Sequence, residues 1–146
     1  MPRARSEAAV SDDALQRILY VEDDADIRKI VSMSLEMVGE YSVAACGSCA
    51  DALEVVDDFD PDLLLLDVMM PDVDGPATLR ALRRRESAAD APAVFITAKV
   101  QALDMDEYKR LGVFDVIVKP FDPMELSDRI GQIWQQYRSD GHDDAG

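Results

Sequence analysis

The feature that most constrains the fold is a change of hydrophobic period that recurs along the chain. Short apolar runs of strand length alternate with longer stretches in which apolar residues recur at helical spacing. The run at 63–66 consists of four leucines, which is too continuously apolar for a strand with one face in water. Strands buried on both faces are typical of parallel sheets covered by helices. The pattern therefore predicts strands and helices that alternate around one parallel sheet.

The bounds of the expected elements follow from the apolar runs and from capping residues. The first helix should begin after Asp24, whose side chain can cap it, and stop at Gly39. Pro76 and Pro123 suit first-turn positions. The expected strands span residues 18–21, 42–45, 62–66, 93–97 and 116–118, and the other expected helices span residues 49–56, 76–85, 103–111 and 123–137. Right-handed crossovers between them predict a doubly wound sheet with helices on both faces, in which ligands bind at the carboxyl ends of the strands.

Length and terminal composition predict one domain with two tails. A chain of 146 residues suits a single hydrophobic core. Residues 1–14 and 139–146 are too polar to bury much apolar surface, so we expect flexible extensions there and one domain over residues 15–138. No recognisable DNA-binding or catalytic region follows Arg138, so we expect a stand-alone domain; a piece of a longer protein is the alternative.

Charge and hydropathy exclude several classes of partner. Thirty acidic residues against 15 basic ones give a net charge of -15, which repels nucleic acid and anionic membranes. No apolar run approaches the roughly 20 residues of a membrane span, and the first ten residues lack the apolar stretch of a signal peptide. Neither a Walker nor a Rossmann glycine-rich loop is present, so nucleotide binding is not expected. We expect a soluble, cytoplasmic protein.

The two cysteines, Cys46 and Cys49, have the Cys-x-x-Cys spacing of some redox pairs. Cys46 should end a strand and Cys49 should start a helix, so two small buried side chains are the simpler interpretation. A structural zinc site needs about four ligands, and the only histidine is His142 in the tail. We therefore expect neither a redox role nor a structural metal.

Polar residues follow the ends of the predicted strands. Glu22 and Asp23 follow the first strand, Asp67 the third and Lys119 the fifth, while Thr97 ends the fourth. Because parallel strands end at one edge, three carboxylates should crowd together there, which is costly unless a cation neutralises them. Magnesium suits such oxygen ligands. Lys119 and Thr97 supply the donors that hold a transferring phosphoryl group, which leaves Asp67 as the nucleophile.

The ordered set of motifs resembles the response-regulator receiver domain over residues 17–138. The motifs are Glu22-Asp23, Asp67 within Leu-Leu-Leu-Leu-Asp-Val-Met-Met-Pro-Asp-Val-Asp-Gly, Thr97-Ala98, and Lys119-Pro120-Phe121. The resemblance implies a flavodoxin-like α/β fold with a five-stranded parallel sheet in the order 2-1-3-4-5. It also implies a cis peptide at Lys119-Pro120.

The resemblance further implies an acyl phosphate on Asp67, received from a phosphohistidine of a sensor histidine kinase or histidine phosphotransfer protein. Asp23, Asp67 and the carbonyl of Met69 would bind Mg²⁺, with Glu22 acting through water, and Thr97 and Lys119 would contact the phosphoryl oxygens. The chain would not be an enzyme beyond self-phosphorylation and auto-dephosphorylation. Its signal would reach a downstream protein through the face built from the fourth helix, fifth strand and fifth helix, and a homodimer is left open.

The chain departs from the family pattern near its fifth strand. Val116 stands where many receivers carry an aromatic switch residue. Phe114 lies two residues earlier, which period-two alternation places on the same side as Val116, and we assign it a packing role. Met69 and Lys99 occupy positions that tune hydrolysis of the acyl phosphate in receivers. Since apolar Met69 cannot orient a water molecule, we expect a long-lived phosphoryl group.

Two charged segments have simple structural interpretations, and two aromatic residues allow two. The acidic loop 72–75 should shape the turn before the third helix, and the basic stretch 80–85 should be a solvated helix face. Trp134 and Tyr137 suit either internal packing or an interaction face, and the choice is left open.

Two alternative functions share parts of the pattern. A phosphatase with an aspartate nucleophile needs a second aspartate two residues after the first, and Met69 occupies that position. A receiver fold that has lost phosphorylation would lack part of the motif set, and all of it is present. Both are disfavoured.

Overall fold

The structure is a computed structural model that describes residues 14–98 and 105–140. Its centre is an all-parallel sheet of five strands in the order β2-β1-β3-β4-β5. The strands are β1 (Arg17–Val21), β2 (Ser42–Cys46), β3 (Leu63–Asp67), β4 (Ala93–Thr97) and β5 (Val113–Val118). The predicted fold class and strand order are thereby confirmed.

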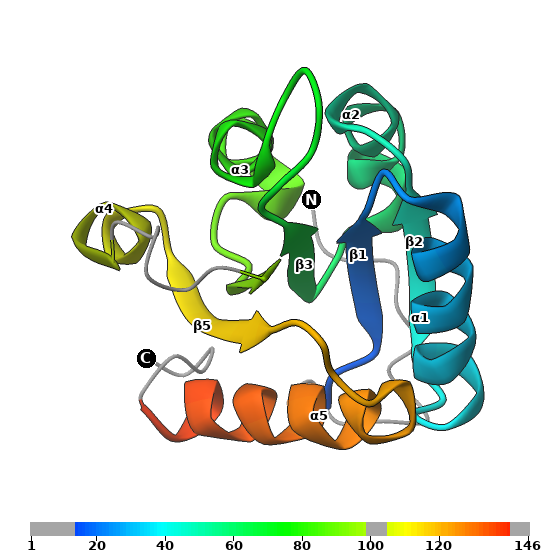
Figure 1. The fold of residues 1–146 in the computed structure, drawn as a ribbon. Helices are drawn as coiled ribbons and strands as arrows, with labels where there is room; N and C mark the ends of the chain where they lie inside the picture. The colour runs from blue at the N-terminus through cyan, green and yellow to red at the C-terminus, as the bar shows by residue number, and fades with distance from the viewer. Residues whose placement is uncertain (1–13, 99–104, 141–146) are drawn as a thin grey trace.

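Helices cover both faces of the sheet (Figure 1). They are α1 (Ala25–Met37), α2 (Cys49–Phe59), α3 (Gly75–Leu82), α4 (Met105–Arg110) and α5 (Pro123–Ser139), with a short 3-10 helix, η1 (Glu86–Ala88). Helices α1 and α5 lie together on one face, α2 and α3 lie on the other, and α4 lies beside β5 (Figure 1). Each predicted helix is present, although most ends differ by one to three residues.

The leucine run of β3 explains why the sheet must be covered twice. All five residues of β3 are buried. Leu63 and Leu65 join the apolar cluster beneath α1 and α5, whereas Leu64 and Leu66 join the cluster beneath α2, α3 and α4. Burying one leucine is worth about 1.5–3 kcal/mol, so each face gains from a helical layer.

Side chains cap the N-termini of four helices, close to the helix starts that the sequence predicts. The Asp24 carboxylate accepts hydrogen bonds from the N–H groups of Asp26 and Ile27, as predicted. Ser48, Asp74 and Asp122 likewise cap α2, α3 and α5. Such a cap is typically worth about 1 kcal/mol. The start of α5 positions the loop that carries Lys119.

The prediction of a solvated helix face at 80–85 is wrong for Arg83. Helix α3 ends at Leu82, and the partly buried Arg83 guanidinium donates hydrogen bonds to backbone carbonyl oxygens in the segments that precede β4 and β5. Its closest acceptors are the carbonyls of Leu111 at 2.9 Å, Ala88 at 2.8 Å and Ala91 at 2.6 Å. An arginine can be partly buried when carbonyl oxygens accept hydrogen bonds from the N–H groups of its guanidinium. Arg83 therefore ties α3 to the starts of β4 and β5.

Strand β5 begins at Val113, three residues before its predicted start, and its pairing with β4 is irregular near that end. Ala93 pairs with Val113 but Val94 pairs with Asp115, so Phe114 is an extra residue. A bulge of this kind resets the alternation of side chains. Phe114 packs edge-on against Tyr137, with ring centroids 5.5 Å apart, whereas Val116 packs against the opposite cluster. The packing role of Phe114 is confirmed, and the expectation that it shares a side with Val116 is wrong.

Aromatic residues of α5 also pack internally. Trp134 is buried and Tyr137 is partly buried in the cluster beneath α1 and α5, with their rings 5.6 Å apart. Of the two roles left open for Trp134 and Tyr137, the structure shows internal packing.

The two cysteines are buried, free thiols in the structure. Burial raises the pKa of the Cys46 thiol to about 11, which keeps it protonated and unreactive. The packing interpretation is confirmed.

Some expectations fall on residues outside the described ranges. They include most of both predicted tails, Lys99 and the predicted start of the fourth helix at residue 103. Helix α5 continues one residue past the predicted domain end at 138. Within residues 14–98 and 105–140, no helix combines the length and apolar character needed to cross a membrane.

Candidate functional site

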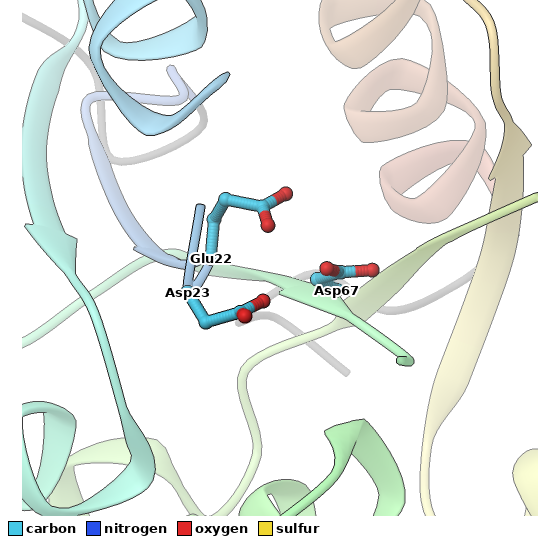
Figure 2. Close-up of side chains that lie close together, drawn as sticks. All are labelled: Glu22, Asp23 and Asp67. Carbon is cyan, nitrogen blue, oxygen red and sulfur yellow. The ribbon is translucent and has the colours of Figure 1, made fainter. Parts of the chain in front are cut away.

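Three carboxylates meet where β1 and β3 end. Val21 of β1 pairs with Leu66 of β3. The residues that follow them, Glu22 and Asp67, therefore lie side by side. Carboxylate oxygens of Glu22, Asp23 and Asp67 lie within 4.8 Å of one another. Figure 2 shows Glu22 and Asp23 reaching from the end of β1 toward Asp67. The predicted convergence at the carboxyl edge of the sheet is thus observed.

The three carboxylates differ in burial, and burial raises the pKa of one of them, Glu22. Glu22 is 1% exposed and Asp67 is 2% exposed, while Asp23 faces solvent. Burial, then a hydrogen bond and the charge of Asp67, raise the pKa of the Glu22 carboxyl well above its ordinary range. The Asp24 N–H, which donates to Oε2 of Glu22 at 3.2 Å, and the charge of Lys119 act in the opposite direction. The buried pair therefore gains from a nearby cation.

Lys119 brings one positive charge to the pair. Its Nζ lies 3.4 Å from Oε1 of Glu22 and 3.5 Å from Oδ1 of Asp67. The lysine follows β5, and its backbone N–H donates to the carbonyl of Thr97 at 2.8 Å. The Lys119-Pro120 peptide is cis, as the resemblance implies. One ammonium against three carboxylates leaves excess negative charge, which suits a divalent cation bound through oxygen.

Thr97 and Met69 complete the set of predicted site residues. Thr97 is 1% exposed at the end of β4, and its strand pairs with that of Asp67 through Ile96. The Met69 N–H donates to Oδ1 of Asp67 at 3.4 Å, while the Met69 side chain is 64% exposed. Every residue predicted for the site therefore lies at one edge of the sheet.

Arg28 supports the site and was not anticipated. Its Nη1 donates to the backbone carbonyl of Glu22 at 2.8 Å, which braces the loop that carries both acids. A Cβ at position 47 would lie 2.9 Å from this Nη1, so Gly47 leaves the room that the guanidinium occupies. In the sequence, an arginine on an amphipathic helix is indistinguishable from a solvated charge.

Gly75 holds the start of α3 against the backbone of Asp67. A Cβ on Gly75 would lie 2.6 Å from the carbonyl oxygen of Asp67 and 2.8 Å from Cα of Val68. The Gly75 N–H donates to the carbonyl of Val68 at 2.9 Å. The loop 72–75 thus shapes the turn before α3, as predicted, and its glycine also fixes the backbone of the central carboxylate.

Comparison with known proteins identifies the family of the chain. A family model for the response regulator receiver domain matches residues 18–131. The chain is 38% identical over 113 residues to the phosphate regulon transcriptional regulatory protein PhoB of Pseudomonas aeruginosa, covering 77% of this chain and 49% of that protein. It is 39% identical over 117 residues to the DNA-binding dual master transcriptional regulator RpaA of Synechocystis sp., covering 80% of this chain and 48% of that protein. The chain spans about half the length of these curated relatives.

Solved structures with the same fold are similar over nearly their whole length. The chemotaxis protein CheY4 of Vibrio cholerae aligns with a TM-score of 0.75 at 28% identity, covering 82% of this chain and 99% of that chain. The non-phosphorylated HemR receiver domain of Leptospira biflexa aligns with a TM-score of 0.71 at 28% identity, covering 82% and 94% respectively. On its sequence match, fold and acidic edge together, the chain belongs to the family of response regulator receiver domains, which serve two-component signalling.

Proposed function

We propose that Asp67 is the phosphoacceptor of this receiver domain, and that it receives its phosphoryl group from a phosphohistidine while Mg²⁺ is bound beside it. The observation that carries the proposal is the position of Lys119 Nζ, 3.5 Å from Oδ1 of Asp67, next to the cluster of three carboxylates. A sensor histidine kinase or a histidine phosphotransfer protein is the donor. The chain itself acts as a signalling domain and carries out self-phosphorylation and auto-dephosphorylation at most.

The transfer exchanges one bond to phosphorus for another. A carboxylate oxygen of Asp67 attacks the phosphorus, the P–N bond to the donor imidazole breaks, and the bonding pair leaves with that nitrogen, which takes up a proton. The Lys119 ammonium and the Thr97 hydroxyl hold the equatorial oxygens as their charge grows. Because Asp67 is almost fully buried, these contacts act where water screens them little.

The same residues fit a magnesium ion. Asp23, Asp67 and the backbone carbonyl of Met69 would hold it, with Glu22 acting through water. A cluster of carboxylate oxygens within 4.8 Å provides the hard, anionic ligands that this ion prefers. Bound there, Mg²⁺ would neutralise charge on the phosphoryl oxygens.

The output is proposed to pass to a downstream protein through the face of α4, β5 and α5, in the cytoplasm. Val118 of β5 is 46% exposed on this part of the molecule. Asp115 of β5 pairs with Arg129 of α5 at 3.3 Å, and Arg80 of α3 pairs with Glu107 of α4. Ion pairs between elements can break or form when phosphorylation changes the conformation of the domain. A homodimer is the alternative occupant of this face.

Incubation of the full chain with acetyl phosphate and Mg²⁺, followed by intact-mass measurement, tests the proposal. A mass gain of one phosphoryl group is expected for the wild type and none for Asp67→Asn. Asp72→Asn is the matched control, since Asp72 is exposed in the neighbouring loop and has a φ of 65°, which asparagine tolerates. Equal labelling of wild type and Asp67→Asn would refute the assignment.

A further inference from the structure

Tyr20 has a buried hydroxyl that the fold does not explain. The residue is 0% exposed in the middle of the sheet, and within the described residues its Oη makes no hydrogen bond. Burying a hydroxyl without a partner costs free energy that phenylalanine in the same place would avoid. The ring is accounted for by the apolar cluster beneath α1 and α5, so the hydroxyl alone needs a role.

The strand register places Tyr20 next to the acidic site. Tyr20 precedes Glu22 by two residues in β1, so strand alternation directs both side chains to the same face. Its partner in β3 is Leu65, which precedes Asp67 by two residues. Side chains lean along a strand, so a long tyrosine can extend toward the carboxylates that follow. Tyr20 therefore approaches the two buried acids from the interior of the protein.

The electrostatic environment of Tyr20 agrees with this placement. Burial first, then the charges of Glu22 and Asp67, and last the approach of the Glu22 carboxylate as a hydrogen-bond acceptor, raise the pKa of the Tyr20 hydroxyl, while Arg28 acts in the opposite direction. Both carboxylates are thus near enough to act on the hydroxyl, which stays protonated and able to donate.

Glu22 has acceptor capacity left for such a donor. Its Oε1 faces Lys119 Nζ at 3.4 Å, and its Oε2 accepts from the Asp24 N–H at 3.2 Å. An ionised carboxylate offers about four acceptor sites, so two donors leave room for a third. The added donor matters most when a cation keeps the carboxylate ionised, because bonds to a charged acceptor are the stronger ones.

We infer that Tyr20 is a positioning residue of the metal site, whose hydroxyl donates a hydrogen bond to the Glu22 carboxylate when Asp23 and Asp67 hold a divalent cation that Glu22 contacts through water. The inference rests on the proposed function. Tyr20 touches neither the cation nor the phosphoryl group. It acts from behind Glu22, holding that carboxylate in the orientation the cation needs, as outer groups do at other metal sites.

The test compares Mg²⁺ binding by the full chain and by Tyr20→Phe, using isothermal titration calorimetry without a phosphodonor. Loss of the hydroxyl is expected to raise the Kd for Mg²⁺ roughly three- to tenfold. With acetyl phosphate, the Mg²⁺ concentration for half-maximal labelling should rise by a similar factor while the rate at saturating Mg²⁺ stays near that of the wild type. Unfolding midpoints in EDTA should be unchanged or higher, since phenylalanine removes an unsatisfied group.

Tyr41→Phe is the matched control. Tyr41 packs against the same apolar cluster, and its pKa is raised by burial and by Asp128 rather than by the acidic site. Its Kd for Mg²⁺ should equal that of the wild type. An unchanged Kd in Tyr20→Phe, or an equal weakening in Tyr41→Phe, would overturn the inference and leave the proposed function standing. A wild-type chain that binds no Mg²⁺ would overturn both the metal site and the inference.

Discussion

Lys119 Nζ lies 3.5 Å from Oδ1 of Asp67, although Asp67 ends β3 and Lys119 follows β5, and these strands are not neighbours in the sheet. Strand β4 separates β3 from β5, so the lysine must reach across the end of β4 to meet the aspartate. The ammonium is also 3.4 Å from Glu22, which makes it a shared counter-charge for both buried acids.

Replacement of Lys119 by glutamine should separate phosphoryl transfer from metal binding. We expect labelling by acetyl phosphate to slow about 100-fold or more, because a donor to the transferring oxygens is lost. The Kd for Mg²⁺ should stay the same or fall, because a positive charge near the cation is removed. Lys109→Gln, at an exposed position of α4, is the control for charge alone. A Lys119→Gln chain that labels at the wild-type rate would contradict this assignment.

The raised pKa of Glu22 predicts how the stability of the metal-free chain depends on pH. Its folded-state pKa lies above its unfolded one, so the folded chain binds more protons in that interval. The contribution to stability is fully present below the ordinary glutamate pKa of about 4.3 and is lost as pH rises through the raised value. In EDTA, the free energy of unfolding should therefore decline more steeply over this interval in the wild type than in Glu22→Gln.

Mg²⁺ affinity should show the opposite trend with pH. Protons compete with the cation for Glu22, so the Kd for Mg²⁺ should fall as pH rises from about 5 to about 8. Calorimetric titrations at several pH values check this. A Kd that is constant over the range, or the same stability slope in wild type and Glu22→Gln, would show that Glu22 does not titrate as proposed.

Gly75→Ala should lower the free energy of unfolding, although alanine favours helices. The added Cβ would meet the Asp67 carbonyl at 2.6 Å and Val68 Cα at 2.8 Å, both of them backbone atoms, so α3 or the Asp67 loop must move. We expect a loss of about 1–3 kcal/mol in the free energy of unfolding, with slower labelling of Asp67. Gly131→Ala in α5 is the matched control, because its nearest neighbour is the Tyr41 hydroxyl at 3.3 Å, the end of a side chain. Equal stability of the two variants would rule out the close approach.

Arg83→Met should destabilise the fold, whereas Arg84→Met should not. Arg83 donates to the carbonyls of Leu111, Ala88 and Ala91, and methionine would leave these acceptors without their donor. We expect a cost of about 2–3 kcal/mol in urea unfolding. Arg84 is exposed, and its replacement should change stability by less than about 0.5 kcal/mol. Similar costs for the two variants would mean that the carbonyl contacts of Arg83 contribute little.

The phosphoryl group on Asp67 is expected to be long-lived. The Met69 side chain is 64% exposed beside Asp67 and offers no polar atom to orient an attacking water. Met69→Asn should shorten the lifetime because its amide can hold such a water. Intact-mass measurements after removal of acetyl phosphate, in Mg²⁺ and without a phosphatase, give the decay. Loss of the wild-type phosphoryl group within seconds would contradict this prediction.

Sequence patterns correctly predict the architecture and the meeting of the acidic residues at one edge of the sheet. The four leucines before Asp67 require a strand buried on both faces, and the cap at Asp24 and the proline at 123 mark helix starts through local chemistry. Glu22, Asp67 and Lys119 follow strand ends, so their meeting at one edge is a consequence of a parallel sheet. These features depend on residues close together in the chain, which is the range over which hydrophobic period and capping patterns act. The chemical roles assigned to the site residues stay predictions.

Which partners several side chains contact is decided by the tertiary structure and has no signal in the sequence. Arg83 was expected in solvent and instead donates to carbonyls in the segments that precede β4 and β5. Phe114 was expected on the same side as Val116, but the irregularity in β5 places it on the opposite face. The contact of Arg28 with the Glu22 carbonyl has no signal in the sequence either, because an arginine on a helix can equally point to solvent. The partners of Arg83 and Phe114 come from distant parts of the chain. A period or a motif describes only a residue's neighbours in sequence, so the partner that satisfies a buried donor becomes known only when the chain has folded.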